Sequence, residues 1–591
     1  MSGKNGSMPS SSETKYQRML RKQWEIQPAR YDWIDRLQMQ MGLPSVVAKI
    51  LSNRGYDTID KVEEFLDCSL AKLNNPFLLK DMDKAVKRIR QAMEQKQKIL
   101  IYGDYDADGT TSTAILMRMF RFLEYDRAEY YVPHRLLEGY GLNRDTLQRL
   151  LGRDIGLIVT VDNGISANDA VDLANARGVQ MVITDHHQPA SELPNAIAVV
   201  DPARPDCNYP FKTLAGCGVA YKLVHAMLRE LNIDEKKARG FLFSLLDLVA
   251  LGTVADIVPI QGENRSIVKH GLERLSKSTK PGVQALLRVA GCENRPMTAG
   301  IISFFLTPRL NAAGRMDHAS LAVDLMTTDD PAEAERLALR LDELNAQRRE
   351  LEQEILLEAQ EAIHKQCNLD EQKIIVIAGK NWHLGVIGIV ASRILEQYHC
   401  PVVILSIEDT VAKGSARSLA GFDIHDALSK TQNLLLSFGG HRMAAGLKIE
   451  TAHINDLRRD INKVVENMPL LEETLPKLLI DAEVTPEELT VEDVQAIRML
   501  APFGCSNPEP LLMMAGMELQ RDPIVVGNNH LKLRLGGLDM LFDAIGFSLG
   551  DWMEEFEQGC RNVEIVFSPS ISTWGGSPKV ELEIKAIRGS R

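Results

Sequence analysis

The 591-residue sequence lacks the usual marks of a secreted or membrane protein. Its eight cysteines are scattered singly and form no CxxC pair, which excludes the common spacing of zinc sites and disulfide frameworks. No uninterrupted apolar run approaches the length of a membrane span. The N-terminal segment MSGKNGSMPSSSETKYQ is polar and lacks the apolar core of a signal peptide. We therefore expect a cytoplasmic protein with reduced thiols, no membrane association and a disordered leader.

An excess of basic charge is also missing. The chain has 68 Lys and Arg side chains against 80 Asp and Glu, for a net charge of -12. This balance weakens a nucleic-acid-binding hypothesis without excluding it, because bound divalent cations cancel negative charge locally. Composition is otherwise that of a globular protein, and the length requires several domains.

One apolar run, ILIYGDYDADG at residues 99–109, ends in three aspartates at alternate positions: Asp104, Asp106 and Asp108. Alternate residues of an extended chain point the same way, so three carboxylates would converge at the end of a buried strand. Such a group of like charges is costly unless cations lie among them. A solvated acidic turn is the alternative for this segment taken alone.

Three further polar clusters follow apolar segments. VTVDNG contains Asp162, VITDHH contains Asp185, His186 and His187, and LGTVADIV contains Asp256. Ligands bind beyond the carboxyl ends of parallel strands, so the clusters that follow strands should meet in one crevice. Carboxylates with imidazoles suit Mn²⁺ or Mg²⁺, and two such ions can promote hydrolysis at phosphorus. Asp162 alone could be a turn residue and the histidine pair structural, but four clusters together favour a metal centre.

The arrangement of apolar segments indicates several units. Between residues 98 and 202, short strands alternate with helices, which predicts a parallel sheet covered on both faces. Asp330-Pro331-Ala332-Glu333 has the residues that begin a helix, and we expect one linker helix to about residue 365. A second α/β unit begins at Lys373. From about residue 475, strands alternate with Gly and Asn turns, which predicts a small antiparallel barrel or sandwich.

The sequences DYDADG, VDNG, TDHH and LGTVAD resemble the four motifs of the DHH phosphoesterase superfamily. Longer segments, among them PHRLLEGYGLN, PRLNAAGRMDHAS and FGGHRMAAG, resemble its RecJ family of bacterial exonucleases over residues 45–591. The resemblance implies a single-stranded-DNA-specific 5′→3′ exonuclease that needs two Mn²⁺ or Mg²⁺ ions and releases mononucleotides. It also implies a role in DNA repair and recombination, with single-stranded-DNA-binding protein and a RecQ-type helicase as partners.

The same resemblance implies an α/β fold class with a parallel-sheet DHH domain, a long linker helix, a smaller DHHA1-like α/β domain and a C-terminal OB-fold β-barrel. The expected boundaries are a disordered leader at 1–30, an N-terminal helical region at 31–97, the DHH catalytic domain with a helical extension at 98–329, the linker helix at 330–366, the DHHA1-like substrate-binding domain at 367–465 and the OB-fold domain at 466–591.

The metal ligands that the resemblance implies are Asp104, Asp106, Asp108, Asp162, His186 and Asp256. Asp106 and Asp108 would supply first-motif ligands with Asp104 beside them, and Asp162 would bridge the two ions. Asp185 would hold a histidine, and His187 would polarise the phosphate or protonate the leaving oxygen. Relatives that act on small phosphates have a histidine four residues before the second aspartate of the first motif. This chain has Tyr102 there, so the ligand set of one ion cannot be copied from them.

The nucleic-acid-binding residues that the resemblance implies are Arg135, Arg309, Arg315, Trp382, Ser415, Arg417, Gly440 and His441. The segment Lys413–Ser418 combines cations with small donors, which suits phosphate oxygens, although a surface strand is the alternative. The residues that would bind a 5′-terminal phosphate are Arg135, Arg309 or Arg315, Ser415 and Arg417. Trp382 and Phe438 would stack on bases, with core packing as the alternative for Phe438.

Two other functions are open. A DHH phosphoesterase acting on nanoRNA or cyclic dinucleotides is typically shorter and lacks the β domain at 480–591. A catalytically inactive replication factor requires eroded metal ligands, but every motif acid is present in this chain.

Overall fold

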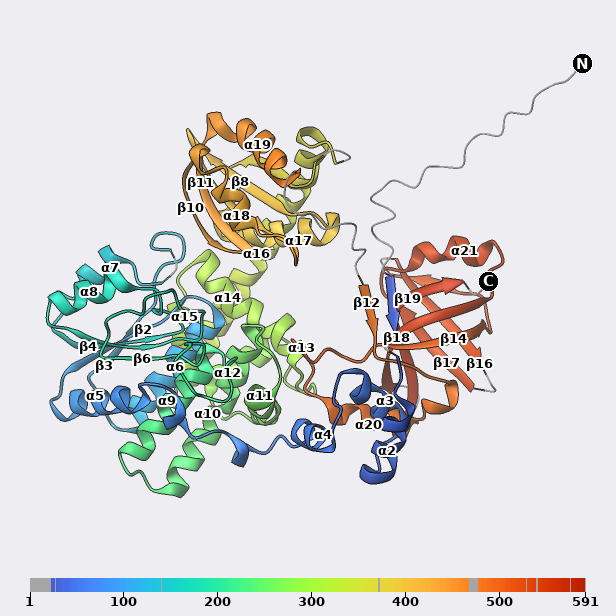
Figure 1. Ribbon diagram of the computed structural model, residues 1–591, viewed down its shortest axis with the longest axis horizontal. Helices are drawn as coiled ribbons and strands as arrows, with labels where there is room; N and C mark the ends of the chain where they lie inside the picture. Colours follow the sequence, from blue (N-terminus) through green and yellow to red (C-terminus); the bar gives the residue numbers. More distant parts are fainter. Residues whose placement is uncertain are drawn as a thin grey trace, which may run out of the picture.

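The chain folds into two α/β units and a β-barrel, connected by a helical region and one long helix (Figure 1). The computed structural model describes residues 23–26, 28–139, 141–369, 372–466, 477–527, 529–537, 540–573 and 576–589. The predicted architecture of α/β units with a C-terminal barrel is confirmed.

The N-terminal segment differs in part from the disordered leader expected at 1–30. Most of that leader lies outside the described residues, but β1 (Gln23–Ile26) is a strand that pairs in parallel with β12 (Lys477–Ile480). The ring of Trp24 lies 4.0 Å from the guanidinium of Arg588 in the barrel. Pairing of the backbone and packing of this ring explain why a polar segment contains a strand.

The first α/β unit is a five-stranded sheet in which all neighbouring strands are parallel. In spatial order its strands are β3 (Ala128–Tyr131), β2 (Lys98–Tyr102), β4 (Ile155–Val161), β5 (Gln180–Thr184) and β6 (Ala198–Val200). Alternate residues enter two cores, so Val159 packs on one face and Ile158 on the other. The first face is covered by α5 (Met82–Glu94), α6 (Ala107–Phe122) and α9 (Gly216–Glu230), and the second by α7 (Arg144–Leu150) and α8 (Asn168–Ala176). Burial of both faces explains why the strands read as continuous apolar runs.

A helical extension follows this sheet. Its helices are α10 (Glu235–Ala255), α11 (Gly262–Leu275), α12 (Pro281–Val289), α13 (Ala299–Ile301), the π-helical turn η3 (Ile302–Leu306), α14 (Thr307–Met316) and α15 (Ser320–Thr327). Within the described residues, α10 is the single helix whose length and composition would suit a membrane span, but its apolar side chains belong to the core. The long helix α16 (Pro331–Gln366) then begins after Asp330, whose side chain accepts a hydrogen bond from the Ala332 N–H.

The second α/β unit has a mixed sheet. In spatial order its strands are β10 (Leu435–His441), β11 (Ala444–Glu450), β9 (Val411–Arg417), β8 (Val402–Glu408) and β7 (Ile375–Lys380). Only β7 and β8 among these pairs run in parallel. The helix α17 (Leu384–Tyr398) and the end of α16 pack on one face, while α18 (Ile424–Ser429) and α19 (Ile454–Glu466) pack on the other.

The C-terminal unit is a barrel that closes through a pairing of β14 with β16. Its strands are β13 (Ala482–Glu483), β14 (Leu512–Leu519), β15 (Ile524–Val526), β16 (His530–Gly537), β17 (Met540–Gly546), β18 (Asn562–Ser572) and β19 (Lys579–Gly589). Two helices, α20 (Val491–Ile497) and α21 (Met553–Glu557), also belong to it. Closure of a sheet in this way removes exposed strand edges and is typical of an OB-fold.

The N-terminal helices α2 (Tyr31–Met41), α3 (Ser45–Asn53) and α4 (Ile59–Leu66) share one apolar core with this barrel. Figure 1 shows these blue helices beside the red barrel strands. Two ion pairs join them, Lys49 to Glu488 at 2.7 Å and Arg54 to Asp481 at 2.6 Å. The barrel unit is therefore built from both ends of the chain.

Candidate metal centre and nucleic-acid interface

The acidic and histidine motifs meet at the carboxyl end of the first sheet, as the strand pattern predicts. The first-motif aspartates follow β2, and Asp106 caps α6 by accepting hydrogen bonds from the N–H groups of Asp108 (2.9 Å) and Gly109 (3.0 Å). Asp162 follows β4, and His186 follows β5. Asp256 comes from a different element, the C-terminal cap of α10.

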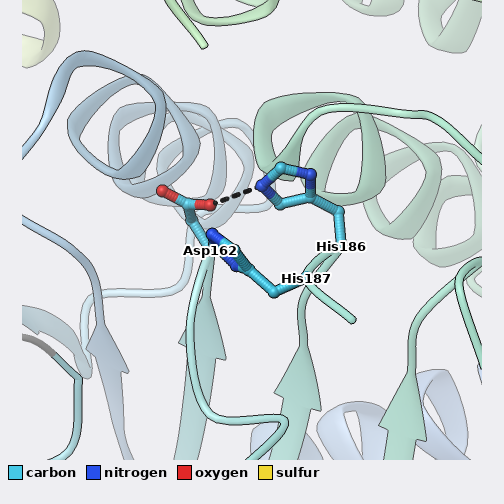
Figure 2. Close-up of side chains that lie close together, drawn as sticks. All are labelled: Asp162, His186 and His187. Carbon is cyan, nitrogen blue, oxygen red and sulfur yellow. Dashed lines mark ion pairs between the residues drawn. The ribbon is translucent and has the colours of Figure 1, made fainter. Parts of the chain in front are cut away.

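Three overlapping groups of side chains offer ligand atoms that lie within 4.8 Å of one another. The groups are Asp104, Asp106 and Asp162; Asp108, His186 and Asp256; and Asp162, His186 and His187. His186 Nε2 lies 3.1 Å from Asp162 Oδ1, the ion pair that is dashed in Figure 2. It also lies 3.5 Å from Asp256 Oδ2. Asp162 and His186 each belong to two groups, which is the arrangement expected where two ions are adjacent.

Burial makes this centre electrostatically unfavourable by itself. Burial and then the charge of Asp108 raise the pKa of Asp162 well above its usual value. Burial and then Asp106 raise the pKa of Asp104, and burial and then Asp108 raise the pKa of Asp256 to about 9. Within the described part of the chain, Asp104 Oδ1, Asp162 Oδ1 and Asp256 Oδ2 are buried without a hydrogen-bond partner. Carboxylates in this state fit divalent cations such as Mn²⁺ or Mg²⁺.

His186 has the protonation state that a metal ligand needs. Burial lowers its pKa, which favours the neutral imidazole, and its Nε2 is buried with no hydrogen-bond partner among the described residues. A neutral imidazole nitrogen beside carboxylate oxygens is a donor set that suits Mn²⁺ well.

The N-terminus of α9 supports the centre, a contribution that the sequence analysis missed. The N–H of Gly216 donates to Asp108 Oδ2 at 2.6 Å, and the N–H of Cys217 donates to Asp108 Oδ1 at 2.9 Å. A Cβ atom at Gly216 would lie 2.7 Å from Asp162 Oδ1, so the close approach requires glycine here. The signal in the sequence was the segment LAGCG at the start of a helix.

Asp185 holds His187 rather than His186. Its Oδ1 accepts a hydrogen bond from His187 Nδ1 at 2.7 Å, and its Oδ2 accepts one from the Ile165 N–H at 2.9 Å. Burial alone would lower the pKa of His187, but the hydrogen bond and charge of Asp185 raise it to about 9. Figure 2 shows His187 beside Asp162 and His186. The contact with Asp185 therefore favours the imidazolium form of His187.

Two further side chains near the centre differ from what the sequence suggests. Tyr102 is buried and donates to the Gly141 carbonyl at 3.2 Å, so its hydroxyl is engaged away from the carboxylates. Asp201 was missed. It is fully buried after β6, and burial followed by the charge of Asp185 raises its pKa to about 8.

An arginine cluster forms where the two α/β units meet. Burial lowers the pKa of Arg315 to about 9, with further lowering by Arg135, Arg348 and Arg417. Arg315 also donates to the Gly385 carbonyl of the second unit at 3.0 Å. Close, partly desolvated guanidinium groups are stabilised by an anion that lies among them. Arg348 lies on α16, which the sequence analysis described only as a linker helix.

The structure assigns other roles to two predicted nucleic-acid contacts. Arg309 donates to Asp342 Oδ1 at 2.8 Å and to the Phe305 carbonyl at 2.7 Å. Trp382 is 5% exposed, and its Nε1 donates to Glu358 Oε2 at 2.6 Å. These contacts contradict base stacking by Trp382, and they occupy the Arg309 guanidinium that would bind a phosphate.

Gly440 and His441 lie on the exposed edge strand β10. A Cβ atom at Gly440 would lie 2.4 Å from the Ala444 carbonyl oxygen, and its φ of +141° also favours glycine. The pair therefore forms a tight strand end.

Two cavities adjoin the arginine cluster. The first, which we call the sheet pocket, has a volume of about 430 Å³ and lies on β9–β11. Its polar lining consists of Tyr105, Arg135, Lys413, Ser415, Ser437 and Lys448. The second, which we call the apolar cleft, has a volume of about 740 Å³ and extends from Ile257 and Phe304 past Arg315 to Phe503 at the barrel.

Comparison with known proteins identifies the family. Residues 98–253 match the DHH family N-terminal domain, residues 371–467 the DHHA1 domain, and residues 480–586 the RecJ OB domain. The chain is 37% identical over 564 residues to the single-stranded-DNA-specific exonuclease RecJ of Dickeya dadantii, covering 92% of this chain and 96% of that protein. The chain belongs to the RecJ family. It is also 36% identical over 583 residues to RecJ of Escherichia coli, covering 95% of this chain and 99% of that protein.

Solved RecJ structures agree with this assignment. RecJ of Thermus thermophilus in complex with Mn²⁺ matches with a TM-score of 0.82 and 30% identity over 97% of this chain and 80% of that one. The same protein in complex with Mg²⁺ matches with a TM-score of 0.76 and 28% identity, covering 97% of this chain and 79% of that one. These two ions are the ones that the carboxylate and imidazole groups of this chain predict.

Proposed function

We propose that this protein is a single-stranded-DNA-specific exonuclease that hydrolyses phosphodiester bonds at the centre around Asp162 and His186. The observation that carries the proposal is that the buried ligand atoms of these residues lack hydrogen-bond partners in the described chain and belong to two ligand groups each. The RecJ relatives, which are named as exonucleases of this specificity, support the same reaction.

Two ions would be held by the acids that meet at the sheet edge. Asp104, Asp106 and Asp162 would hold one, while Asp108, His186 and Asp256 would hold the other. When bound, the ions supply an activated water and stabilise the oxygens of an in-line displacement. The Gly216 and Cys217 N–H groups would keep Asp108 oriented throughout.

His187 is proposed to assist at the phosphate. The hydrogen bond between its Nδ1 and Asp185 fixes the orientation of the ring. As an imidazolium it donates a hydrogen bond to a phosphate oxygen or a proton to the leaving oxygen. The raised pKa of about 9 supports this role, because it keeps the donor protonated at neutral pH.

The arginine cluster is proposed to define the 5′ end. Arg135 and Ser415 line the sheet pocket, and Arg417 donates to Ser415 Oγ at 3.0 Å. A terminal phosphate here, backed by Arg315, gains charge-assisted hydrogen bonds that an internal phosphodiester lacks. This supports 5′→3′ hydrolysis with release of mononucleotides.

The apolar cleft is proposed to receive the bases on the 3′ side of the scissile bond. Phe304 is 79% exposed and Ile257 is 72% exposed, although both are large apolar side chains. Ile257 directly follows Asp256 and has φ +60°, which is unusual for a β-branched residue and typical of functional sites. Stacking of unpaired bases on such a surface favours a single strand.

The cellular assignments rest on the RecJ family alone. We propose that the enzyme acts in bacterial DNA repair and recombination in the cytoplasm, with single-stranded-DNA-binding protein and a RecQ-type helicase as partners. Hydrolysis of nanoRNA or cyclic dinucleotides and an inactive replication role are not favoured, because the acids and the RecJ OB domain are both present.

Degradation of single strands labelled at either end tests this function. We expect early release of a 5′ label as mononucleotide with Mn²⁺ or Mg²⁺, and no release with a chelator. Asp162→Asn should abolish release, since asparagine tolerates the φ of +61° at this position but cannot supply the charge. Asp522→Asn, at an exposed ion pair in the barrel, is the matched control. Initial release of the 3′ label, or full activity of Asp162→Asn, would contradict the proposal.

A further inference from the structure

The sheet pocket extends well beyond the groups that would bind a single terminal phosphate. On β9, Lys413, Ser415 and Arg417 alternate with Ala412 and Ala416, which face the core against α18 and α19. The first three side chains therefore form one row on the opposite face of the sheet. Arg417 is at the arginine cluster, whereas Lys413 is at the far end of the row.

The neighbouring strands continue the same surface. Lys448 of β11 lies directly opposite Lys413, and Gly446 lies opposite Ser415. On β10, Ser437 pairs with Lys448 and Gly439 pairs with Gly446. Paired residues of neighbouring strands lie on the same face, so Lys413, Lys448 and Ser437 form a polar and basic end of this surface. Gly446 and Gly439 lie between that end and the arginine cluster.

The glycines leave the middle of this surface open. A Cβ atom at Gly439 would meet no heavy atom within 4 Å, and one at Gly446 would meet only the Gly414 oxygen at 3.9 Å. Neither glycine has a positive φ, so the backbone conformation at these two positions would also allow a residue with a side chain. The missing side chains instead leave space above the sheet, within the sheet pocket of about 430 Å³.

Two lysines that face each other across a ladder repel one another. Lys413 is partly compensated by Glu408, at 3.0 Å, but both side chains of that pair are exposed. An exposed ion pair contributes little stability, so Lys413 can exchange this partner for a ligand at little cost. An anion between Lys413 and Lys448 would remove the repulsion.

We propose that Lys413, Lys448 and Ser437 form a second anion subsite for the outer phosphates of a 5′-triphosphate. Lys413 is two residues from Ser415 on one strand, about 7 Å away. Two phosphoanhydride links span such a distance, so a chain of three phosphates reaches from the arginine end to the lysine end. The inference rests on the proposed function, because it places the first phosphate at Ser415 and the arginine cluster.

Binding of end-modified strands tests the subsite directly. Oligodeoxynucleotides of one sequence, labelled at the 3′ end and carrying a 5′-hydroxyl, 5′-monophosphate or 5′-triphosphate, are titrated in chelator by fluorescence anisotropy. We expect the triphosphate strand to bind about tenfold more tightly than the monophosphate strand, from added contacts with charged groups. Lys413→Gln/Lys448→Gln should remove this advantage, so that the variant binds the triphosphate and monophosphate strands with equal affinity.

Lys430→Gln is the matched control, because Lys430 forms an exposed ion pair with Asp426 elsewhere in the same unit. It should preserve the triphosphate advantage. A free nucleoside triphosphate should displace the monophosphate strand more effectively from the wild type than from the double variant. Displacement that persists unchanged in the double variant would contradict the subsite.

Equal binding of the triphosphate and monophosphate strands by the wild type would overturn the inference, as would an advantage that survives the double variant. Hydrolysis of the monophosphate strand with Mn²⁺, measured in parallel, separates this failure from that of the proposed function. If hydrolysis persists while the triphosphate advantage is absent, only the second subsite is wrong.

Discussion

The two α/β units have opposite electrostatic designs. The first sheet gathers buried carboxylates around Asp162 whose pKa values are raised by burial and by one another. The second presents Ser415 to the sheet pocket, and burial followed by the charge of Arg135 lowers the pKa of Arg417, which donates a hydrogen bond to Ser415. One unit needs cations and the other needs an anion. A phosphate chain with divalent ions satisfies both, and the comparison explains how a protein of net charge -12 can hold DNA.

The largest expected effect comes from the acidic side. Asp162→Asn should lower exonuclease activity by about a hundredfold or more, because Asp162 belongs to two of the three ligand groups and would lose its charge. In chelator the same variant should melt at a higher temperature than the wild type, since it removes one of several repelling charges. Calorimetry in chelator measures this change in melting temperature, with a scan in Mn²⁺ for comparison and Asp522→Asn as the control. A lower melting temperature in chelator would contradict the account of the centre.

Substitution in the arginine cluster should weaken substrate binding, with little effect on the rate of the chemical step. Arg417→Gln should raise KM for a 5′-phosphorylated strand by about tenfold to a hundredfold with little change in kcat, because a charge-assisted contact is lost. Steady-state kinetics with a 5′-hydroxyl strand supplies the comparison, since the defect should largely disappear there. Arg561→Gln, at an exposed pair in the barrel, should have no effect.

The role of His187 as a proton donor can be tested through the pH dependence of kcat. His187 has a pKa of about 9, so a step that needs its proton should slow as the pH rises through about 9. Asp185→Asn removes the main group that raises this pKa, so the alkaline limb of the kcat profile should move to lower pH. At pH 8 we expect about a tenfold loss of kcat. An unchanged alkaline limb would exclude His187 as the proton donor.

The same pair makes a contribution to stability whose sign is defined. A raised folded-state pKa stabilises the fold at pH values below the unfolded pKa, and the contribution is lost as pH rises through about 9. In chelator, the unfolding free energy of the wild type should therefore fall across this range more than that of Asp185→Asn.

The smallest expected effect lies outside both charged regions. Phe304→Ala should weaken binding of a single strand by about fivefold to tenfold, the range expected for one lost stacking contact. Binding of the mononucleotide product should be unaffected. Leu339→Ala, at an exposed apolar residue of α16, is the matched control for a change in surface hydrophobicity.

Local signals predicted the catalytic sheet and its acids well. Asp162 and His186 follow apolar runs whose length and register are visible in the sequence, and parallel strands necessarily bring their ends together. Trp382 was misassigned because a lone aromatic residue has the same pattern whether it stacks on a base or packs in a core. For Arg309 the sequence could not show the ion pair with Asp342, which is 33 residues away on α16.

Long-range packing could not be predicted. The amphipathic pattern of α3 requires an apolar partner, but nothing in it indicates a barrel more than 400 residues later, where Lys49 meets Glu488. Arg348 lies among many charged residues of α16, and only the fold brings it near Arg315. The sheet pocket likewise depends on the register of three strands, which the sequence does not display.

Equilibrium dialysis with Mn²⁺ is the most direct test of the central claim that buried acids around Asp162 form a two-ion centre. The account predicts two tightly bound ions per chain in the wild type, and a loss of at least one in Asp162→Asn with none lost in Asp522→Asn. Absence of tight binding in the wild type, or two ions retained by Asp162→Asn, would contradict it.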